Sequence, residues 1–324
     1  MTNESCNFSL DADIMGLTCI YSMSFSLGLP ANMLSLWGLY QLGISTGGVQ
    51  LVYLINLLLS DLLQLLTLPT WILYLQRGHN WPYGSIACNI VGYVFYVNLY
   101  ASVAFLCLIA LDRYKAIVRP LRSQGVRTVR VAWLSSLVIW TLTFFFCLGG
   151  LHSVFKQNLA SYESRCLEQY PVSPRYACFK IATIVLGFLL PCCILGFTST
   201  RIAMTLQNSP STSDRDRRKI VGTLCIITVI FIIIFGPYHL VGSYKFVAYF
   251  LTDDRCGLEK SLFLTYRLCY GLTSLNNLLD PLFYIFLSNN IRKELRSMPC
   301  LRRRNCTPKE GTVTNLHLDQ EDHM

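Results

Sequence analysis

Charged residues are scarce in this sequence. Asp, Glu, Lys and Arg account for 14% of its 324 residues, whereas hydrophobic residues account for 53%. A soluble globular protein carries about 25% charged residues. The composition therefore excludes an ordinary soluble domain and indicates a protein that lies in a membrane.

Several motifs are missing as well, and each absence narrows the function. The 14 cysteines show no CxxC or Cys/His spacing typical of a metal site. No P-loop, HExxH motif or nucleophile–base pair is found, so we expect neither an enzyme nor an organic cofactor. The polar start, MTNESCNFSLDAD, lacks the basic region of a cleavable signal peptide. No convincing internal repeat is present, which leaves a secondary transporter only as a distant alternative.

Long apolar runs, by contrast, are abundant. A helix that crosses the hydrocarbon core needs about 20 mostly apolar residues. The segments that meet this requirement are 14–41, 50–76, 86–114, 130–151, 177–206, 219–251 and 261–287. Because the joins are short, we predict an all-α membrane protein with a single seven-transmembrane helix bundle at 14–287, preceded by an extracellular N-terminus at 1–13.

The residues after the last span differ in character. The stretch 288–299 alternates apolar and basic residues at helical spacing, which predicts a short amphipathic cytosolic helix on the membrane surface. A cytosolic tail follows at 300–324. In it, Cys300 and Cys306 flank the basic run LRRRN, and both are candidate palmitoylation sites.

The basic residues are distributed unevenly. One set of loops, together with the C-terminus, carries 18 of the 27 Lys and Arg residues. The positive-inside rule then places the N-terminus outside the cell and the C-terminus in the cytosol. Sequons begin at Asn3 and Asn7 on the predicted outer side, where glycosylation is expected. The net charge of +9 suits an anionic membrane leaflet, so nucleic acid is not an expected partner.

Four cysteines fall on the same outer side. They are Cys6, Cys88, Cys166 and Cys256. An even set in an oxidising space predicts two disulfides, and their positions alone leave three pairings open.

Two acids lie where acids are costly. Asp61 and Asp280 each sit inside an apolar span, where a carboxylate normally faces the bundle interior and marks function. Six further polar residues are candidates to join them: Asn32, Asn56, Asn98, Ser102, Asn276 and Asn277. The predicted site comprises the two acids with Asn98, Ser102 and Asn276. Converging oxygen ligands suit a hard cation, so we predict a sodium or proton site, with Asp61 as the principal sodium ligand. The alternative is a hydrogen-bonded network that only joins helices.

A series of short motifs resembles a known family along nearly the whole chain. They are GLPAN ending at Asn32, NLLLSD ending at Asp61, Trp81 before Cys88, DRY at 112–114, Trp140, Pro191, FGPYH at 235–239 and DPLFY at 280–284. In this order and register the chain resembles a rhodopsin-like (class A) G-protein-coupled receptor. The resemblance implies a plasma-membrane receptor that activates heterotrimeric G proteins in response to an extracellular ligand.

The resemblance also assigns roles. The activation switch would comprise Asp112, Arg113, Tyr114, Phe235, Pro237, Asp280, Pro281 and Tyr284. Asp112 and Arg113 are expected to pair at rest, and a released Arg113 would contact the G protein. The disulfides would be Cys88–Cys166, by the family pattern, and Cys6–Cys256, from the cysteines that remain. Ser and Thr residues at 209–219 and in the tail are candidate kinase targets, which adds receptor kinases and arrestin to the expected partners.

Within the family, GHNWPYG, CLEQYP and CGLEKSLFLTYR resemble the proton-sensing and lysophospholipid receptors. GFLLPCCILGFTSTRI is most similar to the member linked to lysolipids and oxidised fatty acids. Thr143 stands where proton-sensing relatives carry a glutamate, and the chain has only five histidines. Ser199 replaces a tyrosine that helps to hold the active state. These departures weaken the expectation of strong pH sensing without affecting the fold.

The ligand pocket is expected near the outer end of the bundle. Helical spacing and the family pattern assign to it Tyr96, Tyr100, Lys180, Tyr238, His239, Lys245, Arg267 and Tyr270. A basic rim of Lys180, Lys245 and Arg267 over an aromatic floor suits an amphipathic anion such as a lysophospholipid or oxidised fatty acid. Protons are the second expectation, as agonist or modulator. Nucleotide and peptide ligands of the neighbouring branch remain alternatives.

Overall fold

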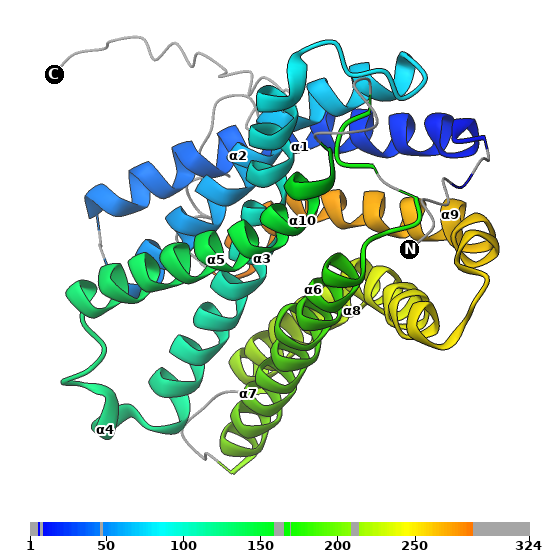
Figure 1. Ribbon diagram of the computed structural model, residues 1–324. Coiled ribbons are helices and arrows are strands. Elements are labelled where there is room, and N and C mark those ends of the chain that lie inside the picture. Colours follow the sequence, from blue (N-terminus) through cyan, green and yellow to red (C-terminus); the bar gives the residue numbers. More distant parts are fainter. Residues whose placement is uncertain are drawn as a thin grey trace, which may run out of the picture.

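The computed structural model describes residues 6, 9–45, 48–158, 165–168, 170–208 and 214–287, all of them in helices or the joins between helices. The predicted amphipathic helix at 288–299, the tail, both sequons, and Cys300 and Cys306 lie outside these residues. Within them the expected all-helical bundle is confirmed (Figure 1).

Six helical segments are long and apolar enough to cross a membrane within the described part of the chain. The first four are α1 (Ile14–Ser45), α2 (Val49–Gln76), α3 (Gly84–Val118) and α5 (Val129–Asn158). The fifth is composite, with α6 (Pro174–Ile184), a π-helical turn (Val185–Leu189) and α7 (Leu190–Gln207) in succession. The sixth is α8 (Asp214–Leu251). Short joins, including α4 (Pro120–Ser123) and the 3₁₀ turn Asp11–Asp13, account for most of the remainder.

The seventh segment is more polar than the others. It consists of α9 (Arg255–Leu272), a 3₁₀ turn (Thr273–Leu275) and α10 (Asn276–Leu287). It packs against α1 and α8 along the bundle. Its polar residue Asp280 is fully buried between helices, and the side chain of Arg267 is 15% exposed.

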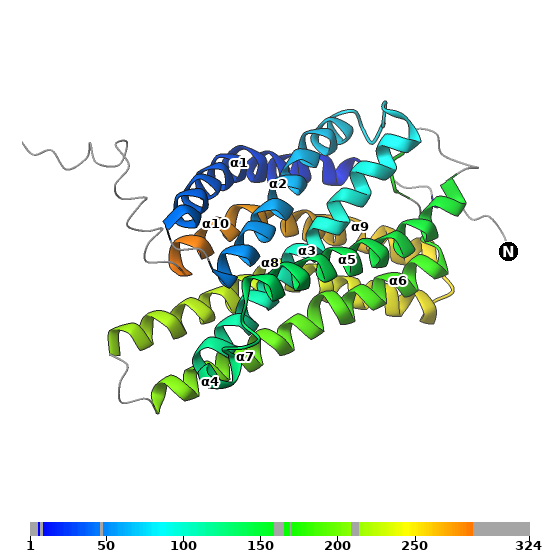
Figure 2. The same cartoon turned by 90° about the vertical axis from the view of Figure 1, so that its left-hand side faces the viewer.

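Helix α3 lies at the centre of the bundle, in contact with α2, α5 and α7 (Figure 2). Phe105 and Leu57 are fully buried in the core that α2, α3 and α5 share. The indole of Trp140 donates a hydrogen bond to Oδ1 of Asn56 at 2.9 Å, so Asn56 joins two helices instead of serving a site. The helix also runs four residues beyond the predicted 86–114, so the Asp-Arg-Tyr triplet lies inside α3 and not at its last residues.

The two ends of the bundle differ. At one end, which we call the disulfide end, Cys88–Cys166 ties the start of α3 to the segment 165–168, and Cys6–Cys256 ties the N-terminal residues to the start of α9. Both pairs are the predicted ones, the first from the family resemblance and the second from the outer cysteines that remained. At the opposite end lie α4 and the termini of α3, α7 and α8 (Figure 2).

One glycine in the π-helical turn of the fifth span lies against α3. The turn is followed, after Leu190, by Pro191, which lacks the N–H that an α-helix would use. A Cβ added at Gly187 would lie 2.6 Å from the ring of Tyr100, a buried residue of α3. Glycine at this position therefore lets the fifth span approach α3.

We expect Gly187→Ala to lower the stability of the purified receptor by about 1–3 kcal/mol, the usual cost of overpacking a filled interior. The matched control is Gly196→Ala in α7, where an added Cβ meets nothing within 4 Å. Thermal unfolding in detergent measures both. Equal melting temperatures for the two variants would show that the Gly187–Tyr100 contact is not limiting.

Candidate ligand site and signalling switch

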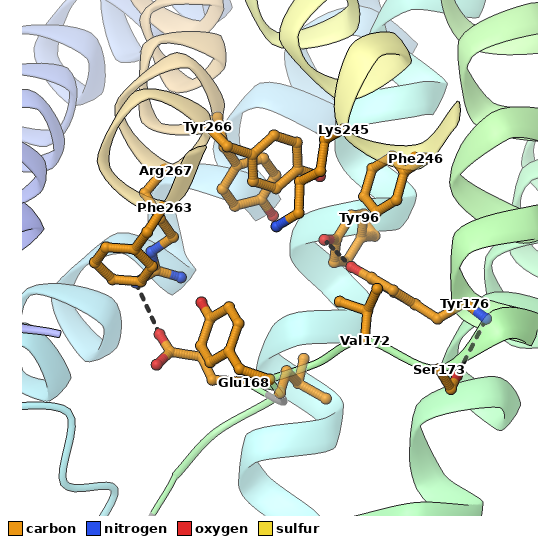
Figure 3. Close-up of a pocket in the computed structure, with 13 residues that line it drawn as sticks. Tyr96, Glu168, Val172, Ser173, Tyr176, Lys245, Phe246, Phe263, Tyr266 and Arg267 are labelled. Carbon is orange, nitrogen blue, oxygen red and sulfur yellow. Dashed lines mark hydrogen bonds and ion pairs between the residues drawn. The ribbon is translucent and has the colours of Figure 1, made fainter. Parts of the chain in front are cut away.

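A cavity of about 80 Å³ opens at the disulfide end (Figure 3). Its walls come from α3, α6, α8, α9 and the segment 167–173. The residues that line it are Tyr96, Leu167, Glu168, Tyr170, Val172, Ser173, Tyr176, Lys245, Phe246, Phe263, Tyr266, Arg267 and Tyr270. Four of the predicted pocket residues, Tyr96, Lys245, Arg267 and Tyr270, are therefore in this wall.

Arg267 is held by a cluster of buried ionisable groups. Its guanidinium bonds to the carboxylate of Asp13 and, at 2.8 Å, to that of Glu168. His79 completes the cluster, because Nε2 lies 3.0 Å from Asp13 and Nδ1 lies 3.0 Å from Glu168. We call these four residues the Arg267 cluster. It joins the N-terminal turn, the α2–α3 join, the segment after Cys166 and α9.

The protonation of this cluster follows from its contacts. Burial alone would lower the pKa of His79, but its hydrogen bonds to Asp13 and Glu168 prevail and raise that pKa to about 9. Burial likewise tends to raise the pKa of Glu168, and the charge of Arg267 together with the bond to His79 holds it below its usual value. Near neutral pH the cluster thus contains two cations and two carboxylates, which cancel.

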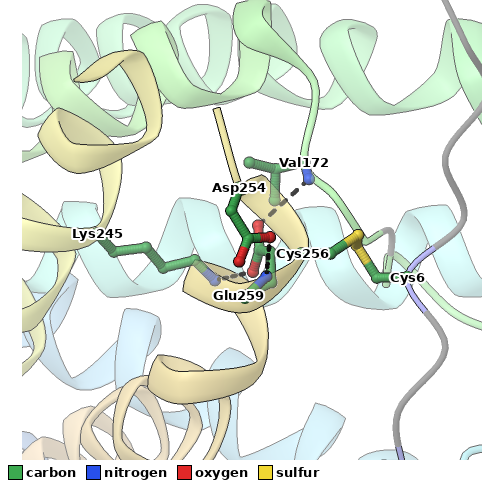
Figure 4. Close-up of a disulfide and its surroundings, with 7 residues drawn as sticks. Cys6, Val172, Lys245, Asp254, Cys256 and Glu259 are labelled. Carbon is green, nitrogen blue, oxygen red and sulfur yellow. Dashed lines mark hydrogen bonds and ion pairs between the residues drawn. A yellow bond between two sulfur atoms is a disulfide. The ribbon is translucent and has the colours of Figure 1, made fainter. Parts of the chain in front are cut away.

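Lys245 is also neutralised. Its ammonium lies 2.7 Å from the carboxylate of Glu259, and both side chains are almost fully buried (Figure 4). The backbone N–H of Val172 donates to the same carboxylate at 3.3 Å. The Cys6–Cys256 disulfide lies beside this pair, at the start of the helix that carries Glu259. The expectation of an uncompensated basic rim is therefore wrong for Lys245 and Arg267, because acids from neighbouring segments fold onto both.

Lys180 is different. Its side chain is 1% exposed, and its ammonium donates to the hydroxyls of Tyr96 at 2.8 Å and Tyr238 at 3.0 Å. The same ammonium lies 4.2 Å from the centre of the Tyr96 ring and 5.2 Å from that of Tyr176. Among the residues that the structure describes, no carboxylate forms an ion pair with it. We call this arrangement the Lys180 cage.

The remaining predicted pocket residues lie deeper than the cavity. Tyr100, Tyr238 and His239 are buried, and the imidazole of His239 stacks on Phe188 with centroids 5.0 Å apart. Within the described part of the chain, the Tyr100 hydroxyl and the Nδ1 atom of His239 have no hydrogen-bond partner. These groups form the floor beneath the Lys180 cage.

A second, mainly aromatic crevice adjoins the cage. It lies between α3, α5 and α6, and its wall includes Tyr93, Cys147, Gly150 and Phe179. Tyr96 and Tyr176 belong both to this crevice and to the cavity of Figure 3. The two spaces therefore meet at the rings that surround Lys180.

The predicted sodium or proton site lies midway along the bundle. Asp280 accepts hydrogen bonds from Ser102 at 3.2 Å and Asn276 at 2.7 Å. The carboxyl group of Asp61 is fully buried and adjoins that of Asp280. Neither oxygen of Asp61 receives a hydrogen bond from a described residue, and the Oδ1 atom of Asn98 also lacks a donor. Asn98 instead donates to the backbone carbonyl of Val94 at 2.7 Å.

The Asp-Arg-Tyr triplet is arranged differently from the expectation. Both carboxylate oxygens of Asp112 accept hydrogen bonds from Arg127, at 2.7 and 3.0 Å, in place of the expected pairing with Arg113. Neighbouring residues on a helix point about 100° apart, which leaves Asp112 accessible to a side chain from the following loop. Tyr114 turns the other way, and its ring contacts that of Phe197 in α7.

The rest of the predicted switch lies in α8 and α10. Phe235 is buried and its ring lies 5.1 Å from that of Phe231. Pro237 lies within α8 and Pro281 within α10, where each interrupts the backbone hydrogen-bond ladder. The side chain of Tyr284 lies outside the described part of the structure.

Sequence reasoning missed the acids that complete these clusters. Asp13, Glu168 and Glu259 stand in or beside predicted loops and gave no periodic signal. Glu168 follows Cys166 by two residues, so its disulfide partner at the start of α3 was the one available clue to its position. Nothing in the local sequence indicated that Arg127 would meet Asp112.

The Arg267 cluster generates a pH prediction. Because the pKa of His79 is raised to about 9 in the folded protein from an ordinary 6.5, its stabilising contribution is full below about pH 6.5 and disappears as the pH passes through 9. The melting-temperature difference between wild type and His79→Gln should therefore be largest near pH 6 and shrink above pH 9. Asn80→Gln, at the exposed neighbouring position, is the control. A difference that stays constant with pH would contradict the charged histidine.

Comparison with known proteins agrees with this architecture. Residues 31–284 match the family described as 7 transmembrane receptor (rhodopsin family). The chain is 33% identical over 300 residues to a human protein named Probable G-protein coupled receptor 132, covering 91% of this chain and 77% of the relative. It is 32% identical over 311 residues to bovine G-protein coupled receptor 68, covering 94% and 84%.

A third relative comes from the neighbouring branch. The rat Uracil nucleotide/cysteinyl leukotriene receptor is 29% identical over 324 residues, with coverage of 99% of this chain and 94% of the relative. These relatives are receptors and not enzymes. The matched region spans all seven helical segments, from within α1 to within α10. The chain belongs to the rhodopsin family of seven-transmembrane receptors, and it is a multi-pass membrane protein that couples an extracellular ligand to a G protein.

Proposed function

We propose that this receptor lies in the plasma membrane with its disulfide end outside the cell and responds to an amphipathic anion, either a lysophospholipid or an oxidised fatty acid. The orientation follows from the uneven distribution of Lys and Arg. The G protein, and with it arrestin and receptor kinases, would then bind at the opposite end. The single observation that carries the ligand class is the Lys180 cage.

A buried ammonium ion is costly unless an anion accompanies it. At Lys180, two hydroxyl groups and the faces of aromatic rings offset part of this cost. Lys245 and Arg267 have carboxylate partners, so an anionic ligand would have to displace an existing ion pair at either one. Lys180 is therefore the cation at which a ligand carboxylate or phosphate gains the most.

The apolar part of the ligand has a place beside the anion. The aromatic crevice between α3, α5 and α6 shares the rings of Tyr96 and Tyr176 with the Lys180 cage. A head group on Lys180 would direct an attached hydrocarbon chain into this crevice. The cavity of about 80 Å³ is too small for a whole lipid, so binding would require side chains around it to move apart.

The same charges favour a lipid over a nucleotide. A nucleotide carries several phosphate charges and would require several uncompensated cations near one another. Of the three cations in the expected rim, Lys245 and Arg267 are already paired. A single remaining cation next to an apolar crevice matches a ligand with one anionic group and a long chain.

We expect Lys180→Gln to reduce the potency of a lysolipid or hydroxylated fatty acid by roughly 10- to 100-fold, because a charged hydrogen bond contributes about 1.5–3 kcal/mol. The measurement is G-protein activation in cells across a panel of such lipids. Arg175→Gln removes an exposed cation from the same helix and should leave potency unchanged. The methyl ester of an active fatty acid, which lacks the negative charge, should act equally weakly on wild type and on Lys180→Gln.

Unchanged lipid potency in Lys180→Gln would overturn the assignment of the anion site. Activation by nucleotides, with no response to any lipid in the panel, would overturn the ligand class. Surface expression measured on intact cells separates either result from a failure to fold.

A second candidate signal is supported by the site at Asp61 and Asp280. Two adjoining carboxyl groups in a fully buried site cannot both be ionised without a cation or a shared proton between them. The oxygens of Asp61 and Asn98 that lack donors suit a hard cation, so Asp61, Asn98, Ser102 and Asp280 would hold sodium. Sodium would offset one of the two negative charges in the resting receptor, and loss of sodium with uptake of a proton would favour the active state.

Low sodium and low pH should accordingly both increase agonist potency. The test titrates agonist potency against sodium at about pH 6.5 and about pH 7.8, at and above the ordinary pKa of histidine. Asp280→Asn should weaken the response to pH, and Asp61→Asn should abolish the response to sodium. The exposed acid Asp253 supplies a control variant, Asp253→Asn, that loses the same charge. Wild-type potency that is indifferent to both ions would identify the two acids as purely structural.

A further inference from the structure

A two-point ion pair lies at the end of the bundle opposite the disulfide end, where the G protein would bind. Arg127 binds Asp112 through two parallel hydrogen bonds, Nε to Oδ1 at 2.7 Å and the terminal nitrogen to Oδ2 at 3.0 Å. The Asp112 side chain is 4% exposed and that of Arg127 is 34% exposed. Two-point contact of a guanidinium with a carboxylate is the most specific ion-pair geometry available to a protein. Arg127 thus occupies both oxygens of the acid in the Asp-Arg-Tyr triplet.

The loop that carries Arg127 is itself ordered by hydrogen bonds. Its backbone N–H donates to the carbonyl of Ser123 at 2.8 Å, which closes a turn after α4. The Ser123 hydroxyl donates to the carbonyl of Pro120 at 3.0 Å. Thr128, the next residue, accepts the backbone N–H of Ala132 in the first turn of α5. Arg127 is therefore presented by a turn that is anchored at α4 on one side and α5 on the other.

Arg113, the residue after Asp112, does not have this carboxylate as a partner. Its Nε atom is buried and has no hydrogen-bond partner among the described residues. Asp112, the preceding residue, is the carboxylate whose charge acts on Arg113, but both of its oxygens are already bound. Two guanidinium groups thus compete for one carboxylate, and Arg127 holds it.

We propose that Arg127 is a positioning residue of the activation switch: by holding Asp112 it keeps Arg113 available to the G protein. Without Arg127, the nearly buried carboxylate of Asp112 would be left unpaired, and Arg113 is the cation close enough to replace the lost partner. Arg113 would then be withdrawn from the G-protein surface. The loop between α4 and α5 becomes part of the switch, and its position determines which arginine pairs with Asp112.

The experiment measures nucleotide exchange by a panel of purified heterotrimeric G proteins with the full-length receptor and no added ligand, so it does not depend on the proposed lipid. Arg127→Ala should lower this exchange by about fivefold, the effect of roughly 1 kcal/mol for a partly exposed ion pair. Arg127→Lys retains the charge but not the two-point contact, and it should be intermediate. Arg122→Ala removes the same charge from an exposed position of the adjacent α4 and should match wild type.

A double-mutant cycle separates positioning from a purely structural role. If Arg127 acts through Asp112, Arg127→Ala should have no further effect on exchange when Asp112→Asn is already present. An equally large loss in the Asp112→Asn background would overturn the proposal, because Arg127 would then be acting elsewhere. Exchange at the wild-type rate in Arg127→Ala would overturn it too. Rates are normalised to folded receptor from thermal unfolding, so reduced folding cannot imitate either result.

Discussion

The cost of burying charge in a helical bundle surrounded by hydrocarbon organises most of this receptor. Each ionisable group that leaves water must gain a partner or a proton, since an isolated buried charge costs several kcal/mol or more. The clusters at the disulfide end meet this demand with acids and bases drawn from segments far apart in sequence, such as Asp13, Glu168 and Arg267. The Cys88–Cys166 disulfide holds the segment that contains Glu168 against the start of α3, so the disulfide and the ion pairs stabilise the same part of the structure.

The same cost of burying charge applies to the groups that remain incompletely paired. Lys180 has hydroxyls and aromatic rings around it but no described carboxylate, and it borders a crevice suited to a hydrocarbon chain. Asp61 lacks a described donor although it is fully buried. At the other end, Arg113 lacks the partner that Arg127 has taken. The proposed ligand, the proposed ion and the G protein would each bind at a position where the protein itself does not complete the electrostatics.

A series of packed aromatic rings connects the Lys180 cage to the switch residues of α8. Tyr238 and His239 adjoin the Lys180 cage from α8, and His239 stacks on Phe188. Phe188 stacks in turn on Phe231, which contacts Phe235 one turn above it in α8. A ligand that moved Tyr238 would therefore act on the helix whose proline, Pro237, interrupts the regular hydrogen-bond ladder. Packed rings of this kind adopt a few discrete arrangements instead of deforming continuously, as a two-state receptor requires.

The sequence by itself determined the helical spans, the family and the residues at the switch positions, because hydrophobic length and short motifs are local properties of the chain. It also predicted that Asp61 and Asp280 share one buried site, and it predicted both disulfides, Cys88–Cys166 from the family pattern and Cys6–Cys256 from the outer cysteines that remained. Only the tertiary structure decided which charges pair. The sequence does not distinguish the three predicted pocket cations, Lys180, Lys245 and Arg267. They differ in the structure because Glu259 pairs with Lys245, whereas Asp13 and Glu168 pair with Arg267. Likewise Asp112 precedes Arg113 in the chain but pairs with Arg127, since adjacent helical side chains diverge while a loop can fold back onto the helix.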